Sequence, residues 1–215
     1  MVRILGKASS INVRKVLWTC HELDLAFERE DWGSGFKSTD TPAFRALNPN
    51  AMVPVLIDPD DGLDGETFVL WESNSICRYL AGRQGRHDLL PAQPRERARV
   101  EQWMDWQATE LNNSWRYVFM SLVRQSPAHQ DPAALAAGVA GWTRHMQLLD
   151  DQLAGPRGPF VLGADFTLAD VVLGLSVQRW FMTPCPKVEL PALQAYRIRL
   201  AQRPGYRLYG DNGLP

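Results

Sequence analysis

The first eighty residues alternate between short apolar runs and one amphipathic stripe. Ser9, Ser10 and Asn12 are good helix N-caps, and apolar residues follow them at a spacing of three to four, which predicts a helix. Gly33 and Gly35 mark a loop that should contain a short helix before the chain returns to the sheet. Another helix should begin near Ser73. Four runs have the length and composition of strands: 2–5, 26–30, 53–57 and 67–71.

The rest of the chain has helical periodicity. Apolar positions from Val100 to Leu122 follow one face of a long helix, and those from Leu135 to Leu153 repeat every three to four residues, as in a helix bundle core. The segment 167–170 resembles a capping box. We therefore predict an α/β domain over 1–82, a polar linker over 83–94 and an all-helical domain over 95–215. The acidic, glycine-containing segment 58–62 predicts a turn between two strands.

Composition excludes several classes of function. The chain has 23 Lys and Arg against 24 Asp and Glu, a formal charge of −1, which gives no reason to expect nucleic acid or an anionic membrane as a partner. The three cysteines form no C-x-x-C pair, and the four histidines have no ligand spacing, so neither a disulfide framework nor a metal site is predicted. A signal peptide and a run of about 18 apolar residues are both missing, which favours the cytoplasm.

Four segments, taken together, carry a family resemblance. In their order and spacing they are similar to the cytosolic glutathione transferases, and the serine followed by asparagine resembles the serine-type, theta- or beta-like bacterial members. The segments are Ser10-x-Asn12-x-x-Lys15-Val16-Leu17, Asn48-Pro49-Asn50-Ala51-Met52-Val53-Pro54-Val55-Leu56, Glu72-Ser73-Asn74-Ser75-Ile76 and Phe166-Thr167-Leu168-Ala169-Asp170.

This resemblance implies a fold, an activity and an assembly. The fold would be a thioredoxin-like N-terminal domain followed by an all-helical C-terminal domain. The activity would be conjugation of glutathione, as a co-substrate with no metal, to a small hydrophobic electrophile in detoxification. The assembly would be a homodimer. Two alternatives stay open: a glutathione-dependent disulfide reductase or peroxidase on the same fold, and a non-catalytic interaction protein that kept the fold.

The N-terminal serines suit the chemistry of a thiol. A free thiol titrates near pH 8.5, and lowering its pKa by two units takes about 2.7 kcal/mol of preferential thiolate stabilisation. The resemblance points to Ser10 and Asn12 as the catalytic residues. The Ser10 hydroxyl would donate a hydrogen bond to the sulfur, and Asn12 would orient it or add a second bond. Ser9 is the alternative donor, and all three residues could instead only cap the helix.

Two further segments suit the rest of the tripeptide. The Val53–Pro54 bond would be cis, exposing the Val53 backbone to the cysteinyl residue of glutathione, unless Pro54 is an ordinary edge-strand proline. Glu72 would pair with the α-ammonium group. Ser73 and the helix N-terminus would bind the γ-glutamyl carboxylate, unless the pair is only another helix cap.

One segment departs from the family pattern. Many relatives have Gly-Lys or Gly-Arg where this chain has Ala51-Met52, so the glycine carboxylate of glutathione needs Lys37, Arg45 or another donor. We still expect Met52 to line the glutathione site. The electrophile pocket is expected between the domains, along the long helix, although aromatic residues at helical spacing are usually core. Its candidate residues are Trp106, Glu110, Asn113, Arg116 and Tyr117.

Overall fold

The computed structural model describes residues 1–59 and 67–215, and they form two compact units, Met1–Leu90 and Pro91–Pro215. The expected turn at 58–62 lies partly outside the described residues. The first unit contains β1 (Val2–Leu5), α1 (Ile11–Glu22), β2 (Phe27–Glu30), α2 (Pro42–Leu47), β3 (Val55–Asp58), β4 (Phe68–Trp71) and α3 (Ser73–Arg83).

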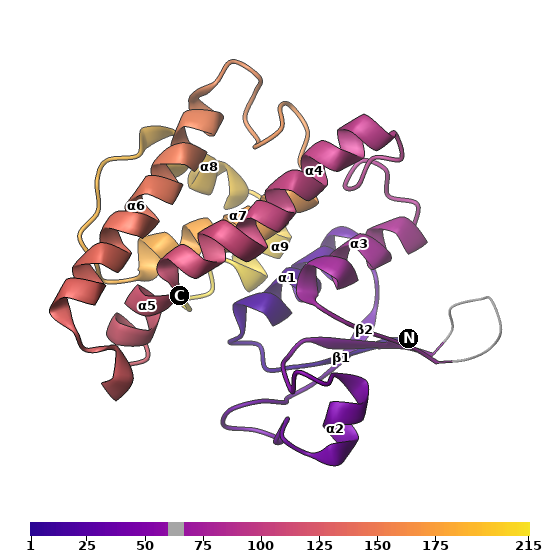
Figure 1. The fold of residues 1–215 in the computed structure, drawn as a ribbon. Coiled ribbons are helices and arrows are strands. Elements are labelled where there is room, and N and C mark those ends of the chain that lie inside the picture. The colour runs from indigo at the N-terminus through magenta and orange to yellow at the C-terminus, as the bar shows by residue number, and fades with distance from the viewer. Residues whose placement is uncertain (60–66) are drawn as a thin grey trace. The chain divides into compact units, whose positions relative to one another are not determined.

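The strands of the first unit form one mixed sheet in the order β2-β1-β3-β4. Strand β1 is parallel to β2, whereas β3 runs antiparallel to both β1 and β4. Helices α1 and α3 pack against each other on one side of the sheet, and α2 lies on the other (Figure 1). Phe44 of α2 is fully buried and packs with Leu5 and Val55 of the sheet. This arrangement is the expected thioredoxin-like domain.

The second unit is entirely helical over the residues described. Its elements are α4 (Pro94–Trp106), the π-helix η1 (Gln107–Leu111), α5 (Asn112–Leu122), the 3-10 turn η2 (Pro127–His129), α6 (Pro132–Ala154), α7 (Leu168–Met182), α8 (Pro191–Leu200) and α9 (Pro204–Tyr209).

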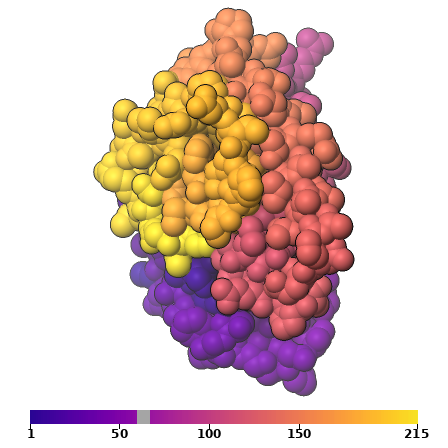
Figure 2. Space-filling model, turned by 90° about the vertical axis from the view of Figure 1, so that its left-hand side faces the viewer, coloured from indigo at the N-terminus to yellow at the C-terminus, as the bar shows by residue number. Residues whose placement is uncertain are grey.

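Helix α7 forms the centre of the second unit. Nearly all its side chains are buried, and the ring of its Trp180 meets Trp142 of α6 edge-on at 4.8 Å between centroids. Helices α6 and α8 also pack together, and Figure 2 shows the salmon-to-orange surface of α6 beside the gold surface of the α8 region. The expected capping box begins α7: the Thr167 backbone N–H and hydroxyl both donate to the Asp170 carboxylate, at 2.8 and 3.2 Å.

Three boundaries differ from those expected. Strand β3 begins at Val55, after Pro54, because proline has no N–H to donate to the ladder. The first compact unit extends to Leu90, into the segment expected as a linker, because Leu89 and Leu90 are buried. The long helix is interrupted by the π turn at Gln107–Leu111. No helix in the described ranges is both long and apolar enough to cross a membrane.

Candidate functional site

A cavity of about 320 Å³ in the first unit brings together most of the residues expected to bind glutathione. It lies where the start of α1, the turn before β3 and the start of α3 meet. Its lining residues are Asn12, Asn48, Asn50, Met52, Val53, Pro54, Glu72 and Ser73.

At the start of α1, the Ser10 hydroxyl and the backbone N–H groups of the first turn make no hydrogen bonds within the helix. Ser10 occupies the N-cap position, yet its hydroxyl makes no hydrogen bond to the helix backbone. The first helical bond runs from Arg14 N to the Ser10 carbonyl at 2.9 Å, so the N–H groups before Arg14 have no helical acceptor. Ser10 and Asn12 are both half-buried. A partly sheltered hydroxyl at the positive end of a helix suits a bound anion.

The turn before β3 is held by one buried side chain. Asn48 is 2% exposed; its Nδ2 donates to the Met52 carbonyl at 2.8 Å, and its Oδ1 accepts from the Asn50 backbone N–H at 3.0 Å. The Val53–Pro54 peptide bond is cis, as expected from the resemblance. Within the described part of the chain, neither the N–H nor the C=O of Val53 has a hydrogen-bond partner, so both are available for an extended peptide.

The start of α3 adds an acid and a helix end. Glu72 is the N-cap residue and holds φ 71° and ψ 111°, a region that side chains rarely adopt. The first helical bond runs from Ile76 N to the Glu72 carbonyl at 2.9 Å, which leaves the N–H groups of the first turn without a helical acceptor. Ser73 is buried, and the Lys15 ammonium donates to Asn74 Oδ1 at 3.2 Å one residue further on. The start of this helix therefore combines the Glu72 carboxylate with the backbone N–H groups of the first turn and one ammonium close by, that of Lys15.

Three of the expected residues do not line the cavity: Ser9, Ser10 and Lys37. Ser10 adjoins it two residues before Asn12, whereas Lys37 is held elsewhere. The Lys37 ammonium donates to Glu30 Oε2 at 3.0 Å and lies 5.3 Å from the centre of the Trp32 ring. The other candidate cation, Arg45, pairs with Asp40 and donates to the Pro49 carbonyl at 3.2 Å.

Sequence reasoning assigned no role to two lining residues, Asn48 and Asn50. Their signal was present, because Asn48-Pro49-Asn50 is a turn sequence whose asparagine side chains often bond to nearby backbone.

The cysteine thiols of the first unit are structural. Cys20 and Cys77 are fully buried, and the Thr19 hydroxyl donates to the Cys77 sulfur at 3.1 Å. Burial raises the pKa of Cys77 to about 11 and raises the pKa of Cys20 further. Both therefore stay protonated at neutral pH and are poor nucleophiles.

The residues expected around the electrophile lie in the second unit. Trp106 packs against Trp103 at 5.2 Å and His145 at 5.9 Å between ring centroids. The Tyr117 hydroxyl accepts from the Asp131 backbone N–H at 3.2 Å. These contacts give both aromatics a place in the packing of that unit. Three others, Glu110, Asn113 and Arg116, are exposed. Their grouping as an electrophile pocket stays a prediction.

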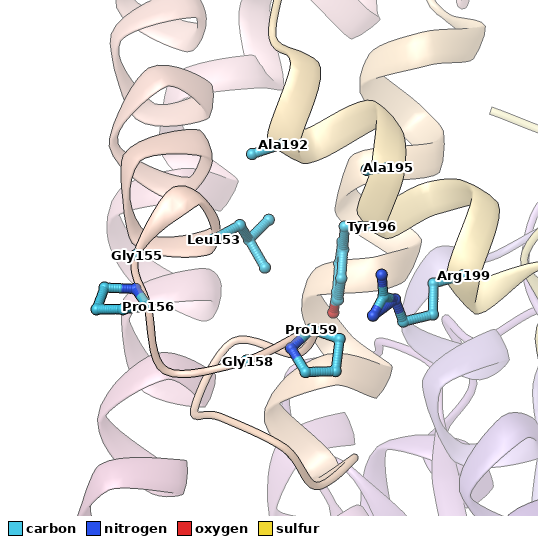
Figure 3. Close-up of a pocket in the computed structure, with 9 residues that line it drawn as sticks. All are labelled: Leu153, Gly155, Pro156, Gly158, Pro159, Ala192, Ala195, Tyr196 and Arg199. Carbon is cyan, nitrogen blue, oxygen red and sulfur yellow. The ribbon is translucent and has the colours of Figure 1, made fainter.

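The second unit has a cavity of its own, of about 390 Å³, between the 155–159 loop and α8 (Figure 3). Leu153, Ala192 and Ala195 give it an apolar wall. Its one hydroxyl, that of Tyr196, donates to Asp170 Oδ1 at 2.9 Å and is therefore part of the structural network that holds α7. We place no chemical step in this cavity.

Comparison with known proteins agrees with this geometry. The glutathione S-transferase N-terminal domain family matches residues 9–83, and the glutathione S-transferase C-terminal domain family matches residues 132–205. The chain belongs to the glutathione S-transferase family.

Individual relatives cover nearly the whole chain. Glutathione S-transferase GstB of Escherichia coli is 35% identical over 96% of both chains. A theta-class glutathione S-transferase from Xanthomonas axonopodis pv. citri, solved with glutathione bound, superposes with a TM-score of 0.86 at 39% identity, covering 97% of this chain and 96% of that one. Disulfide-bond oxidoreductase YfcG of E. coli is 26% identical over 85% of this chain and 81% of its own.

Proposed function

We propose that this enzyme binds glutathione in the cavity of the first unit, stabilises its thiolate and conjugates it to a small hydrophobic electrophile. The observation that carries the proposal is the convergence of three features on one cavity: the α1 start, the unbonded Val53 backbone and the Glu72-Ser73 pair. Each feature suits a different part of the tripeptide: the α1 start suits the thiol, the Val53 backbone suits the cysteinyl backbone, and the Glu72-Ser73 pair suits the γ-glutamyl end.

The binding contacts follow from the available polar groups. Glu72 pairs with the α-ammonium of the γ-glutamyl residue, and the Ser73 hydroxyl together with the N–H groups at the start of α3 holds the adjacent carboxylate. The Val53 N–H and C=O pair with the cysteinyl backbone as one added strand residue. This places the thiol toward the start of α1, where Ser9, Ser10 and Asn12 lie. The glycine end is directed toward Met52 and Asn50.

The chemical step needs a thiolate. The Ser10 hydroxyl donates a hydrogen bond to sulfur, and the α1 N-terminus adds favourable potential, so the thiol releases its proton to solvent at a lower pH. The sulfur lone pair then attacks the electrophilic carbon and forms a C–S bond. The leaving group departs with its electron pair, or an activated alkene takes a proton from water. Asn12 orients the serine or gives a second donor.

The remaining assignments are also part of the proposal. The electrophile binds near Trp106, Glu110, Asn113, Arg116 and Tyr117. The enzyme acts as a homodimer in the cytoplasm, in detoxification, with no metal and no nucleic-acid or membrane partner. The family membership supports the homodimer and the electrophile class.

The test combines binding with thiol titration. Wild type should bind glutathione in calorimetry, and the ultraviolet absorbance of the bound thiolate should report a pKa well below 8.5. Ser10→Ala should keep binding within about threefold but raise that pKa and lower kcat/KM about 10²-fold at pH 6.5. Ser9→Ala is the matched control and should change neither. A complete lack of glutathione binding would defeat the proposal, and an effect in Ser9→Ala alone would move the role to Ser9.

A glutathione-dependent disulfide reductase is the second candidate, and the similarity to YfcG favours it. Because Cys20, Cys77 and Cys185 are all buried and burial raises the pKa of each thiol, the reactive thiol in such a reaction would be that of glutathione. Turnover of a small disulfide such as hydroxyethyl disulfide, faster than turnover of any electrophile in a panel, would favour this activity over conjugation.

A further inference from the structure

The part of the cavity that would receive the glycine end of glutathione contains no cation. Of the eight described residues that line the whole cavity, one is an acid, Glu72, and the others are neutral. A site that relies on a Lys or Arg gains a charge-assisted bond to the glycine carboxylate, and this cavity has neutral donors in that place.

The two cations expected to bind the glycine carboxylate, Lys37 and Arg45, do not line the cavity, and each is held in an ion pair. Lys37 is paired with Glu30, a carboxylate whose pKa is lowered to about 2 by hydrogen bonds from Arg3 and Lys37, so Glu30 stays charged at neutral pH. Arg45 is paired with Asp40 and anchored to the turn through the Pro49 carbonyl. The side chain at position 52 is a methionine with 63% of its surface exposed, at the rim of the cavity.

The neutral donors can be assigned. The Asn48 amide is occupied by the Met52 carbonyl and the Asn50 backbone N–H. The Asn50 side chain is exposed, lines the cavity and makes no hydrogen bond within the described residues. Its Nδ2 group is therefore the amide donor available beside Met52. An amide donor pairs with an oxygen of a carboxylate, a carboxamide or an ester carbonyl alike.

We propose that Asn50 binds the C-terminal group of the thiol substrate as a neutral hydrogen-bond donor, so this enzyme accepts γ-glutamylcysteinyl thiols with little regard to the charge at their C-terminus. The substrate class then includes glutathione, its C-terminal amide and its glycine esters. This inference rests on the proposed glutathione site and specifies the selectivity of one of its ends.

The test measures a ratio of affinities. Calorimetry gives the dissociation constants of glutathione and of glutathione C-terminal amide, which differ in one charge and almost not at all in shape. For wild type the amide should bind less than tenfold more weakly than glutathione. A ratio of tenfold or more would overturn the inference while leaving the glutathione site intact. Failure of wild type to bind either compound would instead defeat the proposed function.

Two isosteric or near-isosteric variants test the residues. Asn50→Asp replaces the donor with a carboxylate of the same shape, so it should weaken glutathione at least tenfold relative to the amide, through like-charge repulsion. Met52→Lys should strengthen glutathione binding at least tenfold relative to binding of the amide, because the new ammonium attracts the glycine carboxylate. It should also make glutathione binding more sensitive to salt. Met52→Gln is its neutral control and should leave the ratio unchanged.

A final variant tests whether Lys37, instead of Asn50, binds the glycine carboxylate. Lys37→Gln should leave the ratio of the two affinities within twofold of wild type, because Lys37 pairs with Glu30 and not with the substrate. A loss of tenfold or more in glutathione binding by Lys37→Gln, with the amide unaffected, would assign the glycine carboxylate to Lys37. An unchanged ratio in Asn50→Asp would also contradict the inference.

Discussion

At the scale of single residues, the turn before the cis proline contains a backbone conformation that its side chain disfavours. Ala51 has φ 53°, in the left-handed region, where a Cβ costs about 1–2 kcal/mol relative to glycine. The glycine that the family pattern implies at this position would adopt this conformation without that cost. In this chain the buried Asn48 side chain holds the turn despite that cost.

Ala51→Gly should consequently stabilise the protein. Relief of the left-handed strain exceeds the extra entropy that glycine gives the unfolded chain, so we expect a gain of about 0.5–1 kcal/mol in unfolding free energy. Urea midpoints measure it. The same change in helix α2, Ala46→Gly, is the control and should lose about 1 kcal/mol. Destabilisation by both variants would contradict the assignment of strain to Ala51.

Glu30 predicts a dependence of stability on pH. Hydrogen bonds from Arg3 and Lys37 lower its folded-state pKa to about 2, whereas an unfolded glutamate titrates near 4.3. A depressed folded pKa contributes stability above the unfolded value, and this contribution is lost as pH falls from about 4.3 towards about 2.

Glu30→Gln should therefore cost about 1 kcal/mol at pH 7, the scale of a solvent-accessible ion pair, and almost nothing at pH 2. Unfolding midpoints across pH, for wild type and variant, measure the difference. Glu28→Gln, two residues earlier on the same strand and exposed, is the control and should change stability little at any pH. A difference for Glu30→Gln that persists at pH 2 would refute the linkage.

How well the sequence predicted individual site residues depended on where their partners lie. Asn12, Val53 and Glu72 stand beside the elements that position them, so local pattern and family resemblance placed them at the cavity. Lys37, whose binding to the substrate stays a prediction, does not line the cavity, and its ammonium donates to Glu30 of β2. That pairing depends on the path of the loop, which no periodicity reveals.

At the scale of elements, the hydrophobic pattern predicts one continuous helix and does not reveal the π turn between α4 and α5. Met104, Gln107, Leu111 and Trp115 are all buried at a spacing that an ordinary α-helix would also satisfy. The wide turn is supported instead by a tertiary contact, from Gln107 Nε2 to the Ser176 hydroxyl of α7 at 3.1 Å. Since such turns often occur at functional sites, the exposed Glu110 on it remains a good candidate for an electrophile contact.

Helix α7 depends on one buried acid. Asp170 accepts hydrogen bonds from the Val161 and Thr167 backbone N–H groups and from the Tyr196 hydroxyl, joining a loop, a helix cap and α8. Asp170→Ala would remove the carboxylate acceptor of these donors and of the Thr167 hydroxyl, so we expect a loss of about 3–5 kcal/mol in unfolding free energy. Thermal and urea unfolding measure it.

The control for Asp170 lies five residues earlier. Asp165 is exposed, and Asp165→Ala should change stability by less than about 0.5 kcal/mol. Near-normal stability in Asp170→Ala would show that the helix start is held by other contacts.

At the scale of the whole molecule, the proposed glutathione site belongs to the first of the two units. All lining residues of the cavity lie in Met1–Leu90, so the contacts described above for the tripeptide come from one unit. The division itself was predictable, because strand-length apolar runs stop near residue 71 and helical periodicity follows. The exact border was not predictable, since Leu89 and Leu90 are buried within a segment rich in polar residues.

Glutathione should therefore protect the first unit selectively. A ligand at one hundred times its dissociation constant stabilises the state that binds it by about 2.7 kcal/mol. Hydrogen exchange with and without glutathione should show its largest slowing at the start of α1, in the turn before β3 and at the start of α3. Protection confined to residues beyond Leu90 would contradict the assigned site.

The backbone of Glu72 has a consequence for any attempt to engineer this enzyme. Glycine at that position would adopt φ 71° and ψ 111° at lower energy, so a selection for heat resistance alone would favour Glu72→Gly. The same change would remove the carboxylate proposed to recognise the substrate's ammonium group. Stability and recognition thus compete at one residue, and a screen of this protein for robustness should score thiol-substrate binding in the same round.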